Sequence, residues 1–266
     1  MAHWSSEAVT RFREYLDETN EVLHLCIDGI RSIEHAVPLA EAVHNLAVIE
    51  GPASVAADSE RSLAQTRARA SLARREVQAG FPLLHAHTLA GVWGSLEAAI
   101  EDLAVGILEH DSTIRSREAV AKIKIGLAEF EQLDQSDRMR TVIGELQRTS
   151  RADQRLGVGA FEVVFDALGF SGSVSEDVRR NVLEFQQLRH VIVHCGSIAD
   201  RRLVSRCPWL ELRPGQKVRI THAQFARLVA TAIHYFADLV ERVREKYGIP
   251  KSQVPPEEEP PATKAN

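Results

Sequence analysis

Apolar residues recur every three or four positions along most of this chain, the spacing that places them on one face of an α-helix. The strongest run begins at Pro82 and predicts a central core helix through Leu89, Trp93, Leu96, Ile100, Leu103 and Ile107. Weaker runs predict helices over 6–26, 29–49, 56–79, 113–132, 136–149 and 157–168. Breaks at Gly51-Pro52 and Gly80 separate the early helices, so 29–49 is expected as one or two short helices.

The stretch from Ser173 to Gly196 predicts a well-bounded amphipathic helix. Ser173 is followed three residues later by Glu176, the pattern of a capping box, and Gly196 suits the position after a helix end. The run Val-Ile-Val at 191–193 favours a strand when taken alone. Its continuity with the preceding apolar stripe favours a helix that ends at His194.

The pattern changes after this helix. Short β-branched runs between 202 and 220 surround Pro214-Gly215, a turn pair, and predict a small β-hairpin. Thr221 and Gln224 then open a last, strongly amphipathic helix, and the Pro- and Glu-rich tail is expected to be disordered. We therefore expect an all-α fold with one hairpin, divided into an N-terminal helical extension (1–80), a helical bundle (81–248) and a tail (249–266).

Composition narrows the possible functions. The chain has 266 residues, 44% hydrophobic and 26% charged, which is ordinary for a globular protein with a sizeable core. Its net charge of −5 argues against non-specific coating of nucleic acid. No stretch approaches the roughly 18 apolar residues of a membrane span, and residues 1–10 lack the pattern of a signal peptide, so we expect a cytoplasmic protein. The three cysteines are too few for a disulfide framework, and reduced thiols are expected.

One arginine and two histidines at the predicted helix end, Arg189, His190 and His194, carry the most specific chemical signal. Metal-free cleavage of RNA requires a proton carrier, which histidine provides, and a fixed positive charge on the phosphoryl oxygens, which arginine provides. On an ideal helix Arg189 and His194 lie about 140° apart. We therefore expect them to converge poorly on a phosphate within one helix, although the long arginine side chain narrows the gap. Pairing with a second copy across a two-fold axis would bring two arginines and two histidines into one cleft. In the simplest other interpretation, His194 only caps the last carbonyls of its helix.

A basic segment follows these residues directly. Between Gly196 and Ile220, six basic residues stand against two acids, Asp200 and Glu211: Arg201, Arg202, Arg206, Arg213, Lys217 and Arg219. Two interpretations fit this segment equally well. It is either a surface that binds RNA phosphates or a hairpin whose charged side chains point into solvent.

A metal site is the alternative for the two histidines, which lie four residues apart on one helical face. Cys195, Cys207 or His222 could supply a third ligand. The zinc-protease pattern, however, needs a glutamate where Val191 stands. We therefore expect neither a metal nor another cofactor.

The Arg-x4-His signature from Arg189 to His194, within the string RHVIVHCGSIADRR, resembles that of the HEPN superfamily, and most of all its RiboL-PSP and MAE-type members of bacterial conflict systems. The resemblance covers roughly residues 83 to 247. It implies a homodimeric helical bundle and metal-independent endoribonuclease activity. Arg189 would bind the phosphate, His194 would transfer protons, His190 would support the site, and Glu97 on an earlier core helix would face the cleft.

The resemblance also implies possible partners. Its members act as toxins, phage-defence effectors or stress ribonucleases, so an RNA substrate is expected, and an antitoxin or other protein is a possible partner. HepT-type toxins, silenced by a nucleotidyltransferase antitoxin, carry an aromatic residue two places after the motif histidine, where this chain has Gly196. The alternative is a non-catalytic HEPN-fold module that binds RNA or a nucleotide, or acts as a scaffold.

Overall fold

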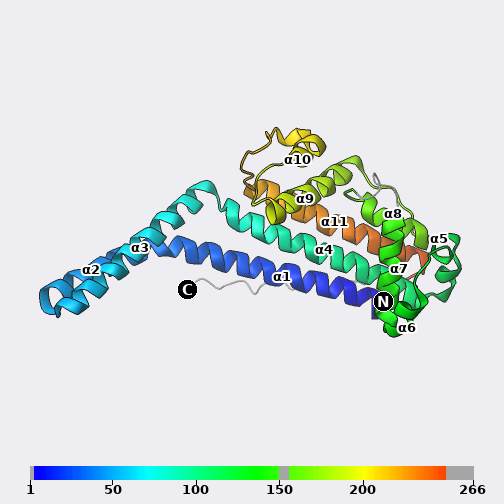
Figure 1. Ribbon diagram of the computed structural model, residues 1–266, viewed down its shortest axis with the longest axis horizontal. Helices are drawn as coiled ribbons and strands as arrows, with labels where there is room; N and C mark the ends of the chain where they lie inside the picture. Colours follow the sequence, from blue (N-terminus) through cyan, green and yellow to red (C-terminus); the bar gives the residue numbers. More distant parts are fainter. Residues whose placement is uncertain (1–2, 150–155, 250–266) are drawn as a thin grey trace, which may run out of the picture.

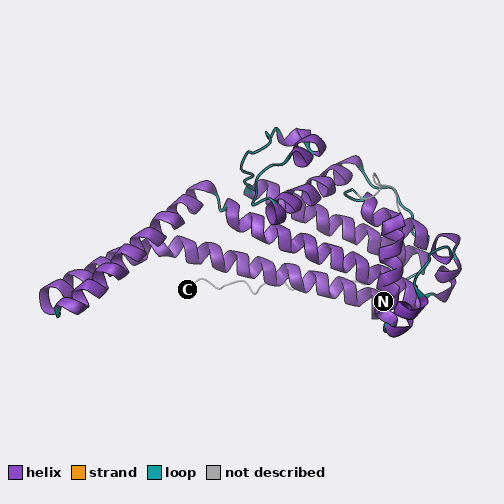
Figure 2. Ribbon diagram, viewed as in Figure 1, coloured by secondary structure: helices purple, strands orange, loops and turns teal. Residues whose placement is uncertain are grey.

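Every regular element in the described part of the chain, residues 3–149 and 156–249 of this computed structural model, is a helix (Figure 2). The all-α class expected from the sequence is therefore confirmed. Three long helices form the body of the molecule (Figure 1): α1 (His3–Ser32), α4 (Pro82–His110) and α11 (His222–Lys246). Most of the tail predicted to be disordered, from residue 250 onward, lies outside the described residues.

Helix α4 is the centre of the core, as its apolar stripe predicts. Leu89, Trp93 and Leu96 are completely or almost completely buried, and each such side chain contributes about 1.5 to 3 kcal/mol through burial. The rings of Phe12 on α1 and Phe236 on α11 meet edge to face at 5.1 Å between centroids. The first helix therefore shares the core of the helices that follow the predicted boundary at residue 80.

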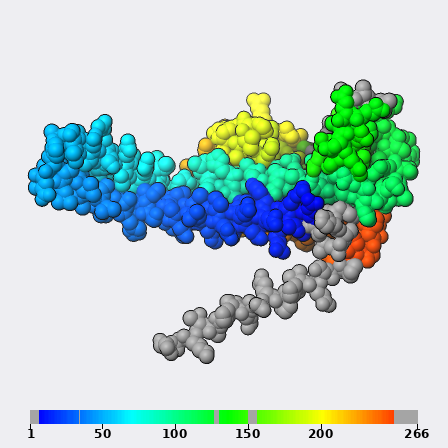
Figure 3. Space-filling model, turned by 90° about the horizontal axis from the view of Figure 1, so that it is seen from below, coloured from blue at the N-terminus to red at the C-terminus, as the bar shows by residue number. Residues whose placement is uncertain are grey.

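Two helices leave this body as an arm, seen at the blue-to-cyan end of Figures 1 and 3. A short 3-10 turn, η1 (Ile33–His35), connects α1 to α2 (Ala36–Glu50), which packs against α3 (Ala53–Ala79). No side chain described in α2 is buried. Gly80 ends α3 in the left-handed conformation, at φ 75°, and turns the chain into α4.

The opposite end of the molecule holds several shorter helices: η2 (Ser112–Ser116), α5 (Glu118–Ala121), α6 (Leu127–Gln132), α7 (Gln135–Thr149) and α8 (Gly159–Leu168). The single helix predicted over 113–132 is wrong. The Asp111 side chain accepts a hydrogen bond from the Thr113 backbone N–H at 2.9 Å, and Arg117 and Gly126 have extended backbones. These turns divide the segment into three pieces.

Helix α9 (Glu176–His194) carries the motif and ends at the predicted residue. Its N-cap, however, is Ser175, which accepts a hydrogen bond from the Val178 backbone N–H at 3.4 Å, so the capping box predicted at Ser173 is wrong. After His194 the chain turns through Gly196 and Ser197, both at positive φ. The Ser197 N–H then donates to the Val191 carbonyl at 2.9 Å, which ties the turn back to the helix.

The hairpin predicted after α9 is wrong, because the segment forms helix α10 (Arg201–Arg206) and the 3-10 turn η4 (Pro208–Leu210). A single antiparallel bridge, Ile198 to Lys217, closes the loop that contains them. Apolar side chains of the segment turn into the core and are buried: Leu203, Cys207, Val218 and Ile220. Packing onto the bundle therefore outweighs the β propensity of the isolated residues. In Figure 3 this segment forms the yellow elevation above α4.

Among the helices that the structure describes, none combines the length and the apolar character that crossing a membrane requires.

Candidate functional site

Arg189 and His194 meet within one chain at the end of α9. Nη1 of Arg189 lies 3.4 Å from Nε2 of His194, and because arginine has only donors, the imidazole nitrogen is the acceptor. The two side chains therefore approach each other within one helix. The long arginine side chain spans the angular separation that the two Cα positions impose.

The two side chains differ in exposure. Arg189 is half-buried, whereas His194 is exposed at the helix end. The Nε atom of Arg189 is buried and has no hydrogen-bond acceptor among the residues that the structure describes. An unpaired buried donor costs about 1 to 3 kcal/mol, so this guanidinium holds hydrogen-bonding capacity that the described protein groups do not use.

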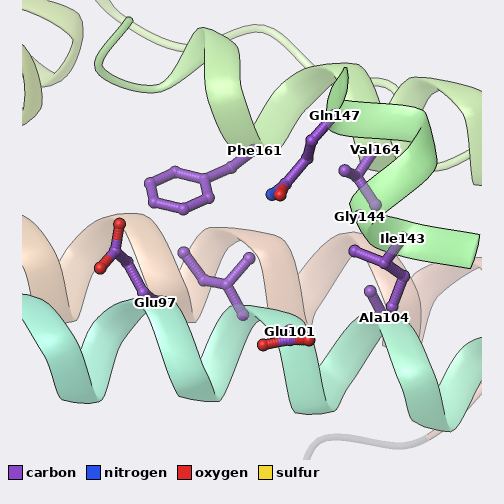
Figure 4. A pocket seen from close by; sticks show the side chains of 9 residues that line it. Glu97, Glu101, Ala104, Ile143, Gly144, Gln147, Phe161 and Val164 are labelled. Atoms are coloured by element: carbon purple, nitrogen blue, oxygen red, sulfur yellow. The ribbon is translucent and has the colours of Figure 1, made fainter. Parts of the chain in front are cut away.

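Glu97, the carboxylate predicted to support the motif, lies on α4, which packs against the motif helix α9. Glu97 stands at one end of a hollow of about 280 Å³, facing Phe161 of α8, with Gln147 of α7 at its rim (Figure 4). Loss of hydration raises the pKa of Glu97, whereas a hydrogen bond with the Trp93 side chain and the positive charge of Arg189 lower it. The carboxylate predicted to support the motif is therefore within electrostatic reach of Arg189.

The ring of His190 lies near that of His194, with 5.1 Å between the ring centroids. Burial lowers the pKa of His190, and the positive charge of Arg202 lowers it further, against the opposing effect of Asp200. The imidazole is therefore predominantly neutral at pH 7. Its Nε2 atom lies 4.0 Å from Oδ2 of Asp200.

Two polar side chains of α9 hold α10 and η4 in place. Gln187 is buried, and its Oε1 accepts from Nε of Arg202 at 3.2 Å and from Nη1 of Arg206 at 3.3 Å. Glu184, 1% exposed, accepts from the Trp209 indole at 2.8 Å. The chain that follows the motif is thus fixed to the motif helix by hydrogen bonds as well as by apolar packing.

The four residues predicted to bind RNA are all exposed, but they do not form one group. Arg201 opens α10, and Arg202 contacts Gln187. Lys217 donates to the Gly196 carbonyl at 3.2 Å. Lys217 and Arg219 also line a hollow of about 670 Å³, and residues of α3 and α4 line its other side. Arg75 from α3 adds a third cation to that hollow, a contribution from the N-terminal helices that the sequence alone does not indicate.

The structure brings together a different set of possible metal ligands from the set that the sequence suggests. Cys207 is fully buried, and His222 faces His85, with 3.4 Å between ring nitrogens, so neither joins the motif histidines. The residues that come together are His190, Cys195 and Asp200. Asp200 was missed as a site residue; its signal in the sequence is an acid placed directly before a helix start.

Comparisons of the chain with protein-family models, curated proteins and solved structures find no match. We therefore infer function from the site itself.

Proposed function

We propose that this protein is a metal-independent endoribonuclease whose active site is built around Arg189 and His194. The observation that supports the proposal most directly is the 3.4 Å approach of Nη1 of Arg189 to Nε2 of His194 at a solvent-exposed helix end. A permanent cation and a titratable imidazole side by side are the two groups that cleavage of a phosphodiester by its own 2′-hydroxyl requires.

In the proposed reaction, His194 removes the proton of the ribose 2′-hydroxyl, whose oxygen attacks the adjacent phosphorus. The P–O5′ bond breaks, the leaving oxygen takes a proton, and the products are a 2′,3′-cyclic phosphate and a 5′-hydroxyl. Arg189 stabilises the charge that gathers on the phosphoryl oxygens, which its planar guanidinium matches. Burial raises the pKa of Glu97 overall, and the opposing effect of the Arg189 charge supports a role for this carboxylate in orienting the guanidinium from the α4 side.

The reaction needs an acid as well as a base, and we propose that a second copy supplies it in a homodimer. Two apolar side chains beside the motif are partly exposed, Val193 at 50% and Ile198 at 38%. Their burial between two copies would bring a second His194 to the same phosphate. As a toxin, phage-defence effector or stress ribonuclease of the cytoplasm, such an enzyme would also need an antitoxin or another partner to restrain it.

Incubation of the purified protein with RNA in EDTA tests the proposal. We expect cleavage that leaves 2′,3′-cyclic phosphate ends and is lost in Arg189→Ala and in His194→Ala. The same substitutions at Arg13 and His24, both exposed on α1, serve as matched controls and should leave the rate unchanged. RNA binding without cleavage would instead support the non-catalytic binding module.

A further inference from the structure

Three potential metal ligands meet beside the Arg189–His194 pair. His190 lies near the end of α9, Cys195 is the C-cap of that helix, and Asp200 is the N-cap of α10. One ligand atom from each lies within 4.8 Å of the other two, and all three side chains are half-buried. We propose that His190, Cys195 and Asp200 form a binding site for zinc or a chemically similar divalent transition metal ion.

The donor set selects the class of metal. Imidazole nitrogen, thiolate sulfur and carboxylate oxygen are the three ligand types that zinc accepts in proteins, whereas calcium and magnesium require oxygen ligands. Three protein ligands leave the fourth tetrahedral position open to water. The even spacing His190-x4-Cys195-x4-Asp200 does not indicate a metal site by itself. The three residues come together in the fold because a turn and a helix cap connect their segments.

The distances fit with a small contraction. Around tetrahedral zinc, with bonds of about 2.0 to 2.3 Å, neighbouring ligand atoms are about 3.3 to 3.6 Å apart. Nε2 of His190 and Oδ2 of Asp200 are already at 4.0 Å. Side-chain rotation of half-buried groups can supply the remaining shift without moving the backbone.

Two ligands are held in place by the backbone. Oδ1 of Asp200 accepts the Leu203 N–H at 2.7 Å, which leaves Oδ2 as the atom that faces His190. Cys195 is fixed because its own N–H and the Ser197 N–H both donate to the Val191 carbonyl, at 3.0 and 2.9 Å. The contact on Oδ1 orients the Asp200 carboxylate as outer contacts orient metal ligands, and the bonds at Cys195 fix the position of its backbone.

The charge balance is also favourable. Arg189 and Arg202 both act on His190 and would repel a bare dication. A thiolate from Cys195 and the carboxylate of Asp200 together neutralise the two charges of the ion, so the filled site with a neutral imidazole carries no net charge. The site can therefore form next to the two arginines.

The site would couple metal to the motif. The His190 ring lies 5.1 Å from the His194 ring, so an ion on His190 would lie next to the proposed catalytic pair and compete with it for the phosphate oxygens of a bound RNA. On the proposed ribonuclease function, stoichiometric zinc should inhibit cleavage by the wild type and spare Cys195→Ser. Binding itself does not require the chain to be a nuclease, so the two proposals can fail separately.

Titration of the metal-free protein with Co²⁺ tests the site by spectroscopy. We expect one ion per chain, with tetrahedral d–d bands and a thiolate-to-cobalt charge-transfer absorption that zinc displaces. Asp200→Asn should weaken binding at least about tenfold, and it preserves folding because asparagine is as good an N-cap as aspartate. Cys195→Ser should abolish the charge-transfer band.

Cys26, half-buried on α1, gives the matched control. Cys26→Ser should keep both the band and the affinity. Absence of the band in the wild type, or a band of unchanged strength in Cys195→Ser, would overturn the proposal.

Discussion

The indole Nε1 of Trp209 donates a hydrogen bond of 2.8 Å to Oε2 of Glu184, which joins the turn after α10 to the buried face of α9. Gln224 and Arg227 of α11 donate to the other oxygen of the same carboxylate, at 2.8 and 2.6 Å. One buried side chain thus connects two segments, η4 and α11, to the motif helix. Arg180 adds to this joint from above the Trp209 ring, 4.6 Å from its centroid.

Glu184→Ala should therefore destabilise the protein by about 2 kcal/mol, because it removes a buried carboxylate that accepts hydrogen bonds from three side chains. Chemical denaturation measures the loss. The same substitution at Glu14, exposed on α1, should change the free energy of unfolding by less than about 0.5 kcal/mol. Equal effects at the two positions would show that the carboxylate does not join these segments.

His85 makes stability depend on pH. Burial and the charge of His222 lower its pKa below the ordinary 6.5, so the folded chain binds fewer protons at this position than the unfolded chain. The free energy of unfolding should therefore be highest above about pH 6.5 and fall as the pH drops below it.

Denaturant titrations at several pH values check this dependence in His85→Gln. The variant loses the stacking of His85 on Phe225, with 5.0 Å between centroids, so it should be less stable at about pH 7.5. Its deficit should narrow toward pH 5.5, whereas His24→Gln should follow the wild-type slope. A deficit for His85→Gln that stays constant with pH would contradict the prediction.

The sequence predicts the long helices well because each buries one continuous apolar stripe. Leu89 and Leu96 on α4 and Val182 and Leu188 on α9 are all buried as expected. The segment after α9 could not be predicted in the same way. There, capping by Asp200 and contacts with residues distant in the sequence determine the structure. These contacts outweigh the β propensity of the segment.

The residues of the candidate site could likewise be predicted only in part. The residue types of the motif identify Arg189 and His194, but their convergence depends on a side-chain path that helical angles alone do not describe. The approach of Asp200 to His190 depends on the fold of α10, so it has no signature in the periodicity.

The cysteines should differ sharply in reactivity. Cys207 is fully buried, and burial raises the pKa of its thiol to about 12, so it carries almost no thiolate at neutral pH. Cys26 and Cys195 are half-buried. Alkylation of the native protein followed by peptide mass spectrometry should label these two within minutes and Cys207 only after denaturation. Labelling of native Cys207 at the rate of Cys26 would refute the placement of its side chain.

Val193 tests the proposed dimer. Val193→Asp places a charge on the apolar surface beside the motif, so it should shift the solution mass measured by light scattering to that of a monomer and reduce RNA cleavage at the same time. Val22→Asp on α1, at a side chain 58% exposed, is the matched control and should change neither. A wild type that is monomeric while it cleaves RNA would rule out the composite site.

The most direct test of the central claim is a double-mutant cycle of RNA cleavage rates in EDTA with Arg189→Ala, His194→Ala and the double variant. If the two residues act as one catalytic unit, each single variant should lose at least about a hundredfold, and the double variant should lose little more than the worse single one. An intact RNA substrate with the wild type, or wild-type rates in either single variant, would contradict the account.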